Sequence, residues 1–355
     1  MPAGALKVPC EHPPGRPAFA DGFTMKNHAS VFPSCCTPSA LSRKSGSDGR
    51  SLPDVYKERF GFGEGGHRIE QRTIMGGAFW MGDAQGDGAF EDGEQPVHAV
   101  FLDTFHIDVT SVTNDDFARF VAATGYITSA ERHGVSAVFY QQVLADAEDI
   151  VGPFPGTPWW LGVRGAHWRH PGGRGSSIEG FETHPVVHVS WHDAMAYCHW
   201  AGRTLPSEAQ WEFAARGGIS QARYPWGDDL MPGAAWQCNI WQGRFPEQNS
   251  IRDGWRYTAP VRTFDSNGYG LWQCVGNVWE WCSDWFARNY YARSPLSNPK
   301  GAESGNRRVM RGGSFLCHDS YCNRYRNAAR ASNTPDSATS NLGFRTAGGA
   351  VTTNP

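Results

Sequence analysis

The spacing of apolar and polar residues predicts three amphipathic helices. Each stretch opens with a Ser or Thr that can cap a helix, carries a polar partner at the third helical position, and closes at glycine. This is the pattern of a capping box followed by a glycine C-cap. The predicted helices lie within 113–125, 190–202 and 207–218. After residue 220 no stretch has convincing helical spacing.

Short apolar runs predict strands at 79–81, 97–102 and 105–107. Trp279, Trp281 and Trp285 alternate along a fourth run, which favours a strand with one aromatic core face. The stretch "HPVVHVSWHD" is typical of a strand followed by a helix. In that reading His184 and His188 are packed or capping residues, and Cys198 in the next helix is a small buried one.

Composition explains why the elements are short. The chain of 355 residues contains 42 Gly, 23 Pro and 15 Trp, so turns interrupt it often and large aromatic side chains must supply much of the core. Residues 1–66 are rich in Pro, Gly, Ser and charge, and predict a flexible N-terminal extension. One domain over 67–350 is therefore expected, of the α+β class with much irregular structure.

Charge and hydropathy narrow the functional classes. The net charge of −3 gives no electrostatic basis for nucleic-acid binding. No apolar run has the length of a membrane span, and the N-terminus lacks the apolar core of a secretory signal. We expect a cytoplasmic monomer.

Cys317 and Cys322 are the leading chemical candidates among nine cysteines. Five residues along a helix or strand do not bring two side chains to the same side, so a turn would have to make the sulfurs converge. Converging thiols fit a disulfide, a redox pair or a soft metal ion such as Cu(I), whereas zinc usually takes four ligands. Buried, idle thiols are an equally open interpretation.

Two loops carry oxygen ligands of the kind that Ca²⁺ prefers. One offers the side chains of Asn239 and Asp253 and the carbonyls of Ile240 and Trp255. The other offers Gln273, the carbonyls of Gly276 and Val278, and Glu280. Asn and Asp in such loops more often form Asx turns, so the residues alone leave both interpretations open.

Several motifs together resemble the formylglycine-generating enzymes, also called sulfatase-modifying factors. They include "LPSEAQWEFAARGG", "CNIWQGRFP", "GNVWEW" and "RGGSFLCHDSYCNRYR", and the resemblance covers nearly all of 67–348. It implies a C-type-lectin-like fold. It also implies an oxidase that uses O₂ and a thiol reductant to convert the cysteine of a Cys-x-Pro-x-Arg motif in unfolded sulfatases to Cα-formylglycine.

The resemblance further assigns roles to single residues. It implies Cu(I) between Cys317 and Cys322, an active-site serine at Ser314, and calcium at both oxygen-rich loops. Trp279 and Tyr321 would line the substrate cleft, with His318 as a neighbour. Asn327 and Thr346 stand where vertebrate members have cysteines, so the disulfides of those members are expected to be absent.

Two alternative functions share this fold. One is a non-catalytic binding module, which the presence of both cysteines disfavours. The other is a related iron-dependent oxidase of small thiols, for which the sequence lacks a suitable histidine triad. The extension also contains Cys36-Thr37-Pro38-Ser39, the first four positions of the modification motif, followed by Ala40 instead of arginine. This is either coincidence, a pseudosubstrate or a weak autosubstrate.

Overall fold

The computed structural model describes residues 37–39 and 66–349, all of which belong to one compact unit. Residues 1–36 and 40–65 of the predicted extension lie outside the described residues. The strands are β1 Gln71–Ile74, β2 Gly77–Met81, β3 His98–Leu102, β4 Phe105–Asp108, β5 Val135–Phe139, β6 Ile150–Phe154, β7 Thr157–Arg164, β8 Gly243–Arg244, β9 Gln248–Asn249, β10 Trp279–Trp285, β11 Arg308–Arg311, β12 Arg330–Asn333, β13 Leu342–Gly343 and β14 Ala347–Gly349.

The α-helices are α2 Asn114–Thr124, α3 Ser129–His133, α4 Trp191–Ala201 and α5 Glu208–Ala215. Single 3₁₀ turns are η1 Phe90–Asp92, η2 Tyr140–Gln142, η3 Ala147–Asp149, η4 Pro232–Ala234 and η5 Tyr291–Arg293. No α-helix of the described chain begins after residue 220, as the sequence predicted.

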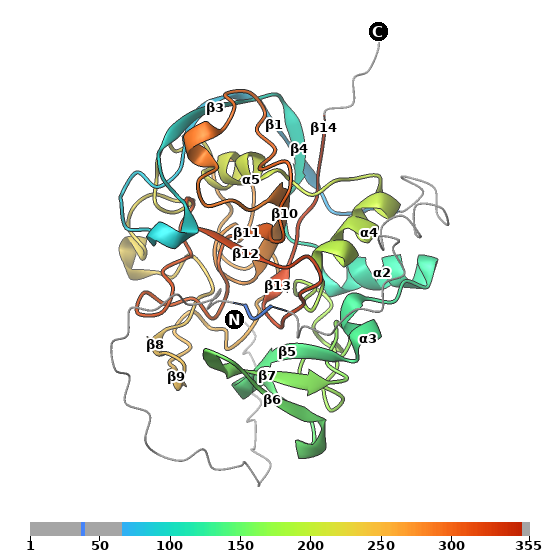
Figure 1. Ribbon diagram of the computed structural model, residues 1–355. Coiled ribbons are helices and arrows are strands. Elements are labelled where there is room, and N and C mark those ends of the chain that lie inside the picture. The colour runs from blue at the N-terminus through green and yellow to red at the C-terminus, as the bar shows by residue number, and fades with distance from the viewer. Residues whose placement is uncertain (1–36, 40–65, 350–355) are drawn as a thin grey trace, which may run out of the picture. The chain divides into compact units, whose positions relative to one another are not determined.

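A four-stranded sheet in the order β12-β11-β10-β13 forms the centre of the fold (Figure 1). Strands β10, β11 and β12 pair antiparallel, while β13 runs parallel to β10. The sheets β1-β4-β14 and β5-β7-β6 lie on either side of it in Figure 1, with helices α2, α3 and α4 grouped beside them. Strand β10 therefore has a neighbour on both edges.

The three predicted helices are confirmed, together with their caps. Thr113, Ser190 and Ser207 each form a capping box with the residue three positions on. Helices α2 and α4 end at glycines in the left-handed conformation, whereas α5 ends one step earlier, at Arg216 in the right-handed conformation. The short helix α3, which Thr128 and Glu131 cap in the same way, was not predicted.

The strand predicted within "HPVVHVSWHD" is absent. Only an isolated bridge joins Pro185 to Thr113, and His188 has a φ of 58°, which no strand residue adopts. The His188 ring is fully buried between Ser136 Oγ at 2.7 Å and the carbonyl of Pro171 at 2.9 Å. It is a packed residue, as predicted.

Buried ion pairs fix the two strand ends that flank the cysteine segment. Arg311 at the end of β11 donates to Glu208 at 2.8 Å, and Arg330 at the start of β12 reaches the same carboxylate at 2.6 Å. All three side chains are buried, so each charge needs its partner. This network holds β11 and β12 against helix α5.

Candidate functional site

The candidate site begins where strand β11 leaves the central sheet. Gly313 there has a φ of 73°, which favours glycine. A Cβ at this position would lie 2.6 Å from the carbonyl oxygen of Arg324 and 3.2 Å from the sulfur of Cys317. The backbone on the two sides of the cysteine segment therefore approaches too closely for any other residue.

Cys317 is buried and held by the backbone around it. Its sulfur accepts the N–H of Ser314 at 3.3 Å, and its own N–H donates to the Ser314 carbonyl at 2.8 Å. Its carbonyl oxygen accepts the N–H of Trp241 at 3.0 Å. The position of this thiol is consequently fixed by three backbone contacts.

Cys322 lies at the other end of a tight turn and is half-exposed. The carbonyl oxygen of His318 accepts the N–H groups of Tyr321, Cys322 and Asn323 at 3.0, 2.9 and 3.2 Å. The chain therefore turns between Cys317 and Cys322, which is what convergence of their sulfurs would require. Both cysteines pack against the same hydrophobic cluster, one from inside and one at its margin.

Ser314 is buried beside Cys317, and its orientation is set from a distant part of the chain. Its hydroxyl oxygen accepts from Asn341 Nδ2 at 2.9 Å and from the N–H of Leu316 at 3.3 Å. Asn341 in turn accepts from the hydroxyl of Thr339 at 2.8 Å. The sequence analysis missed Asn341, because nothing local to the cysteines points to a residue so far along the chain.

An aromatic group flanks the turn. Tyr321 stacks on Phe245 with ring centroids 4.2 Å apart, and meets Trp159 edge-on at 5.1 Å. Tyr321 and Trp159 are half-exposed, which suits them to contact a peptide. Trp159 on strand β7 was not predicted.

Trp279 requires a correction. It was expected to line a substrate cleft, but its side chain is 0% exposed within the main core, because both faces of β10 are covered at this position. Its backbone N–H donates to the carbonyl of Asn341 at 2.9 Å, so Trp279 helps to hold the residue that binds the Ser314 hydroxyl.

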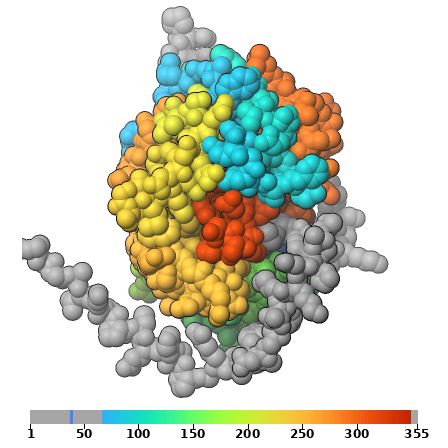
Figure 2. Space-filling model, turned by 90° about the vertical axis from the view of Figure 1, so that its left-hand side faces the viewer, coloured from blue at the N-terminus to red at the C-terminus, as the bar shows by residue number. Residues whose placement is uncertain are grey.

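His318 lies half-buried at the surface of the turn. Its Nδ1 contacts Ser320 Oγ at 2.7 Å and Asp319 Oδ1 at 2.9 Å. The following segment is tied to neighbouring parts of the chain by Arg324, which donates to Asp92 at 2.6 Å, and by Asn327, whose N–H donates to the carbonyl of Arg223 at 2.8 Å. Figure 2 shows this orange-red stretch reaching the surface between cyan and yellow segments.

The first predicted calcium set is brought together in part. The Asp253 carboxylate accepts from the backbone N–H groups of Ile240 at 3.1 Å and Trp255 at 3.0 Å, and Asn239 precedes Ile240 in the chain. The Ile240 carbonyl, one of the predicted ligands, accepts from the side-chain amide of Gln242 at 2.5 Å. Burial raises the pKa of Asp253, and the Oδ1 atom of Asn239 is buried without a hydrogen-bond partner. A buried carboxylate beside an unused amide oxygen fits a hard cation such as Ca²⁺.

This set is connected to the cysteine segment through the backbone. Ile240 is followed by Trp241, whose N–H binds the Cys317 carbonyl. The carbonyl of Asn239 also accepts from Asn277, whose own carbonyl accepts from Phe315. Backbone hydrogen bonds therefore join this set to Phe315 and Cys317, the first and third residues after Ser314.

The second predicted calcium set is not supported at Glu280. Its two carboxylate oxygens accept from Arg345 at 2.7 and 2.9 Å, and also from Trp211 and Ser111. Arg345 thus neutralises the charge that was expected to bind calcium. Gln273 Oε1 is buried without a hydrogen-bond partner, so this amide oxygen is still available to a cation. Gly276 and Val278 lie three and five residues farther along the chain.

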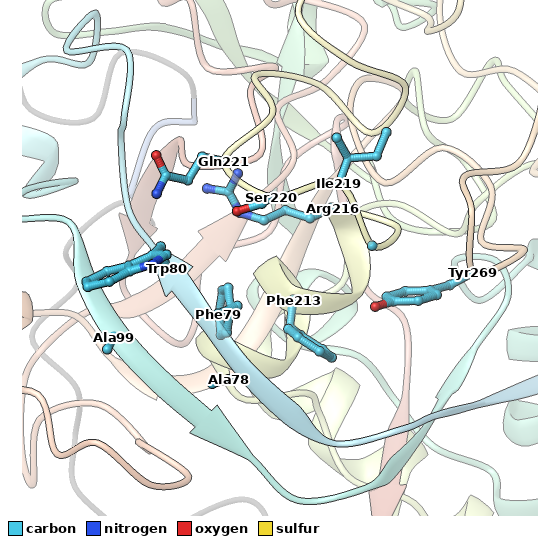
Figure 3. Close-up of a pocket in the computed structure, with 11 residues that line it drawn as sticks. Ala78, Phe79, Trp80, Ala99, Phe213, Arg216, Ile219, Ser220, Gln221 and Tyr269 are labelled. Carbon is cyan, nitrogen blue, oxygen red and sulfur yellow. The ribbon is translucent and has the colours of Figure 1, made fainter.

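Within the described residues, no group of three or more His, Cys, Asp and Glu side chains converges as a metal site. That finding disfavours the four-ligand zinc alternative. A pocket between strand β2 and the end of helix α5 is lined by Phe79, Trp80, Phe213 and Tyr269 among others (Figure 3). None of its lining residues belongs to the cysteine segment, so it is a separate feature.

Comparison with known proteins identifies the family. Residues 67–350 match the domain described as sulfatase-modifying factor enzyme 1-like. The chain belongs to this family. A formylglycine-generating enzyme of Streptomyces coelicolor is 60% identical over 284 residues, which cover 80% of this chain and 90% of that protein.

Similarity in this family extends to a protein without the activity. A Bos taurus protein named inactive C-alpha-formylglycine-generating enzyme 2 is 42% identical over 289 residues, covering 80% of this chain and 90% of that protein. Family membership alone therefore does not establish activity.

The predicted fold class is confirmed. PvdO from Pseudomonas aeruginosa superposes with a TM-score of 0.58 at 22% identity, covering 79% of this chain and 94% of that one, which shows a shared fold. Among the described residues, no helix has the length and apolar character needed to cross a membrane.

Proposed function

We propose that this protein converts a cysteine in unfolded sulfatases to Cα-formylglycine, within a Cys-x-Pro-x-Arg motif. The observation that supports this most is the arrangement of Cys317 and Cys322 at the two ends of one turn. Ser314 lies beside the buried thiol of Cys317 and donates its backbone N–H to that sulfur. A binding module would not need two thiols held in this way. The predicted monomer and cytoplasmic location stay predictions.

The overall reaction requires both an oxidant and a reductant. One substrate cysteine, one O₂ and two thiols give one aldehyde, one H₂S, one disulfide and one water. The substrate loses its C–S bond and one C–H bond, and is oxidised by two electrons. The two thiols supply the other two electrons that reduce O₂ completely to the water and aldehyde oxygens.

Copper fits the donor set, because two thiolates suit a soft monovalent ion. Cys317 and Cys322 would hold it, and bound Cu(I) would supply the one-electron chemistry that O₂ activation needs. Cys317 lies on the protected side and is fixed by backbone contacts, whereas Cys322 is half-exposed. A substrate thiol can therefore approach from the side of Cys322.

Ser314 and the aromatic group would orient the substrate. The Ser314 hydroxyl accepts from Asn341, so its proton is available to donate to a sulfur or oxygen atom near Cys317. Tyr321 and Trp159 offer flat surfaces on which a proline ring or an arginine side chain can pack. A substrate that is extended and unfolded would reach both groups at once.

The second candidate function is a non-catalytic peptide-binding module. The similarity to a relative named as inactive favours keeping it as the alternative. Such a protein would bind the same peptide through Tyr321 and Trp159 but leave its cysteine unchanged.

The test is mass spectrometry of a Cys-x-Pro-x-Arg peptide incubated with the protein, Cu(I), a thiol reductant and air. Conversion of the cysteine to an aldehyde is expected, and Cys317→Ala and Cys322→Ala should each abolish it. Cys198→Ala is the matched control, because this thiol is free and buried in helix α4, away from the turn. A folded, copper-loaded protein that binds the peptide without converting it would establish the binding module instead.

A further inference from the structure

Two arginines follow Cys322 closely, and both are largely removed from water. Arg326 is buried, and the Arg324 side chain is 13% exposed. A guanidinium keeps its charge when it is buried, so each of these side chains needs an acidic partner. Both partners lie 232 residues earlier in the chain, at Asp92 and Glu94.

The partners belong to the loop between β2 and β3, which we call the carboxylate loop (residues 83–94). Glu94 accepts two hydrogen bonds from Arg326, at 2.8 and 3.0 Å, in the bidentate geometry that an arginine and a carboxylate favour. Asp92 accepts two from Arg324, at 2.6 and 2.8 Å. The carboxylate loop therefore holds the segment after the second cysteine at two points.

Hydrogen bonds within the carboxylate loop fix its own shape. The N–H of Asp83 donates to the carbonyl of Glu94 at 3.0 Å, which closes the loop. The Asp83 carboxylate accepts at 3.1, 3.0 and 2.9 Å from three N–H groups of the same loop, those of Gln85, Gly86 and Gly88. The carbonyl of Gly93 accepts from Arg330 at 2.8 Å, which ties the loop to the start of β12. The loop is thus a fixed support for the arginines.

Arg326 also contacts the cysteine turn directly. Its Nε donates to the carbonyl of Asn323 at 2.8 Å, and the N–H of Asn323 donates to the carbonyl of His318 at 3.2 Å. The same His318 oxygen accepts the N–H of Cys322. The residue directly after Cys322 is therefore held through both its N–H and its carbonyl.

Asn323 needs this support because of its backbone conformation. Its φ of 47° lies in the left-handed region, which is costly for residues that have a Cβ, although Asn visits it more readily than most. A residue keeps such a conformation only where its surroundings enforce it. The bond from Arg326 supplies part of that enforcement. Because Cys322 is the adjacent residue, the position of its thiol depends on the same bond.

We propose that Arg326 is a positioning residue for Cys322, held in place by the carboxylate loop. This inference rests on the proposed function, because that function makes Cys322 a copper ligand. Cys317 is fixed by backbone contacts of its own, whereas Cys322 is half-exposed on the open side of the site. Support through the residues that follow Cys322 holds this thiol without covering it, so a substrate can still approach.

Arg326→Lys tests the direct contact. Lysine keeps a positive charge for Glu94 but has no N–H at the place of Nε, so the bond to the Asn323 carbonyl is lost. Arg345→Lys is the matched control, because Arg345 is equally buried and pairs with Glu280 at 2.7 and 2.9 Å, outside the cysteine segment. Both lysine variants should lose stability, but only one of them changes the turn.

The full chain is measured at pH 8, above the pKa of about 7 to which burial raises Glu94, so that this carboxylate carries its charge. Hydrogen exchange, with and without Cu(I), reports on the backbone N–H groups of Tyr321, Cys322 and Asn323. Competition with a coloured chelator gives the Cu(I) affinity, and mass spectrometry of the cysteine peptide gives conversion. Urea denaturation of each variant shows how much stability it has lost.

In Arg326→Lys the N–H groups of the turn should exchange faster, and the Cu(I) affinity should fall about tenfold or more, the usual effect of losing a group that orients a metal ligand. Arg345→Lys should keep both wild-type values. Glu94→Gln is a second variant, which loosens the hold on Arg326 and leaves the arginine itself in place. It should shift both quantities in the same direction but by less, because Asp87 lies 3.3 Å from the same guanidinium.

Equal losses of Cu(I) affinity in Arg326→Lys and Arg345→Lys would overturn the positioning role, because both would then follow from reduced stability. A wild-type Cu(I) affinity in Arg326→Lys would overturn it as well, even if the wild type converts the peptide normally. If Arg326→Lys does not fold, Glu94→Gln decides by the same measurements. If the Cu(I) affinity falls as expected but the wild type leaves the cysteine peptide unchanged, the positioning inference stands and the proposed oxidase function fails.

Discussion

Gly313 allows the sharpest test of how the cysteine segment is built. Replacing it with alanine forces a left-handed φ of 73° on a residue with a Cβ, and puts that Cβ 2.6 Å from the Arg324 carbonyl oxygen. The left-handed conformation costs about 1–2 kcal/mol. The overlap must be relieved by moving backbone, which costs roughly a further 1–3 kcal/mol.

Gly134 separates these two contributions. Its φ is 68°, but a Cβ there would have nothing within 4 Å. Gly134→Ala should therefore lose only the conformational cost of about 1–2 kcal/mol, while Gly313→Ala loses about 2–5 kcal/mol in total. Urea denaturation of the wild type and both variants measures the free energy of unfolding.

The two variants should also differ in copper binding. The movement at Gly313 displaces either the Arg324 backbone or the Cys317 sulfur, so the Cu(I) affinity should fall by about tenfold or more, as it does when groups that orient metal ligands are changed. Competition with a coloured Cu(I) chelator measures that affinity, and Gly134→Ala should leave it unchanged. Equal stability losses together with equal copper affinities would refute the reasoning about close packing at the turn.

Three further predictions concern calcium, buried charge and pH. Ca²⁺ should raise the melting temperature of the wild type; Asp253→Asn should abolish that rise, whereas Glu247→Gln at an exposed carboxylate should keep it, and calorimetry with and without a calcium chelator measures the difference. Arg345→Met leaves the Glu280 carboxylate buried and unpaired, and should cost about 3–5 kcal/mol in urea denaturation, with partial recovery when Glu280→Gln is added. Burial lowers the pKa of His188 to about 4 from an ordinary value of 6.5, so the unfolded state binds the proton more tightly. The free energy of unfolding should have its full value above pH 6.5 and should fall by roughly 3 kcal/mol toward pH 4. A His188→Gln variant whose free energy of unfolding depends on pH as the wild type's does would contradict this.

The sequence predicted local structure well where a few neighbouring residues decide it. The helices α2, α4 and α5 were found because a capping box needs only two side chains three positions apart. The sheet β5-β7-β6 was not found. Its strands contain Gly152 and Pro153 and change register within the β6 pairing, so they lack regular alternation.

The site was predicted only in part, for a related reason. The cysteine pair stands out because its members are close in sequence. Asn341 and Trp159 join the site through tertiary packing, and no local pattern marks them. Trp279 and Trp159 are the same residue type, yet Trp279 is in the core and Trp159 is half-exposed. Trp279 is buried because its strand, β10, is enclosed on both edges and both faces.

The two cysteines have unequal surroundings because the site has two opposing requirements. It must hold its thiols in fixed positions, and it must also admit a substrate thiol. A site that must receive a thiol from another polypeptide needs one side open, and here that side is the half-exposed Cys322. An open site loses precision unless its other side is fixed, and the Ser314 and Trp241 backbone contacts fix Cys317.

Asn341 donates to the Ser314 hydroxyl from a distant part of the chain and so sets the orientation of that hydroxyl. Asn341→Ala should therefore weaken conversion of the cysteine peptide more than it weakens binding of the peptide. The ratio of the two effects, measured on the same peptide, separates a residue that orients the reacting groups from one that only admits the substrate.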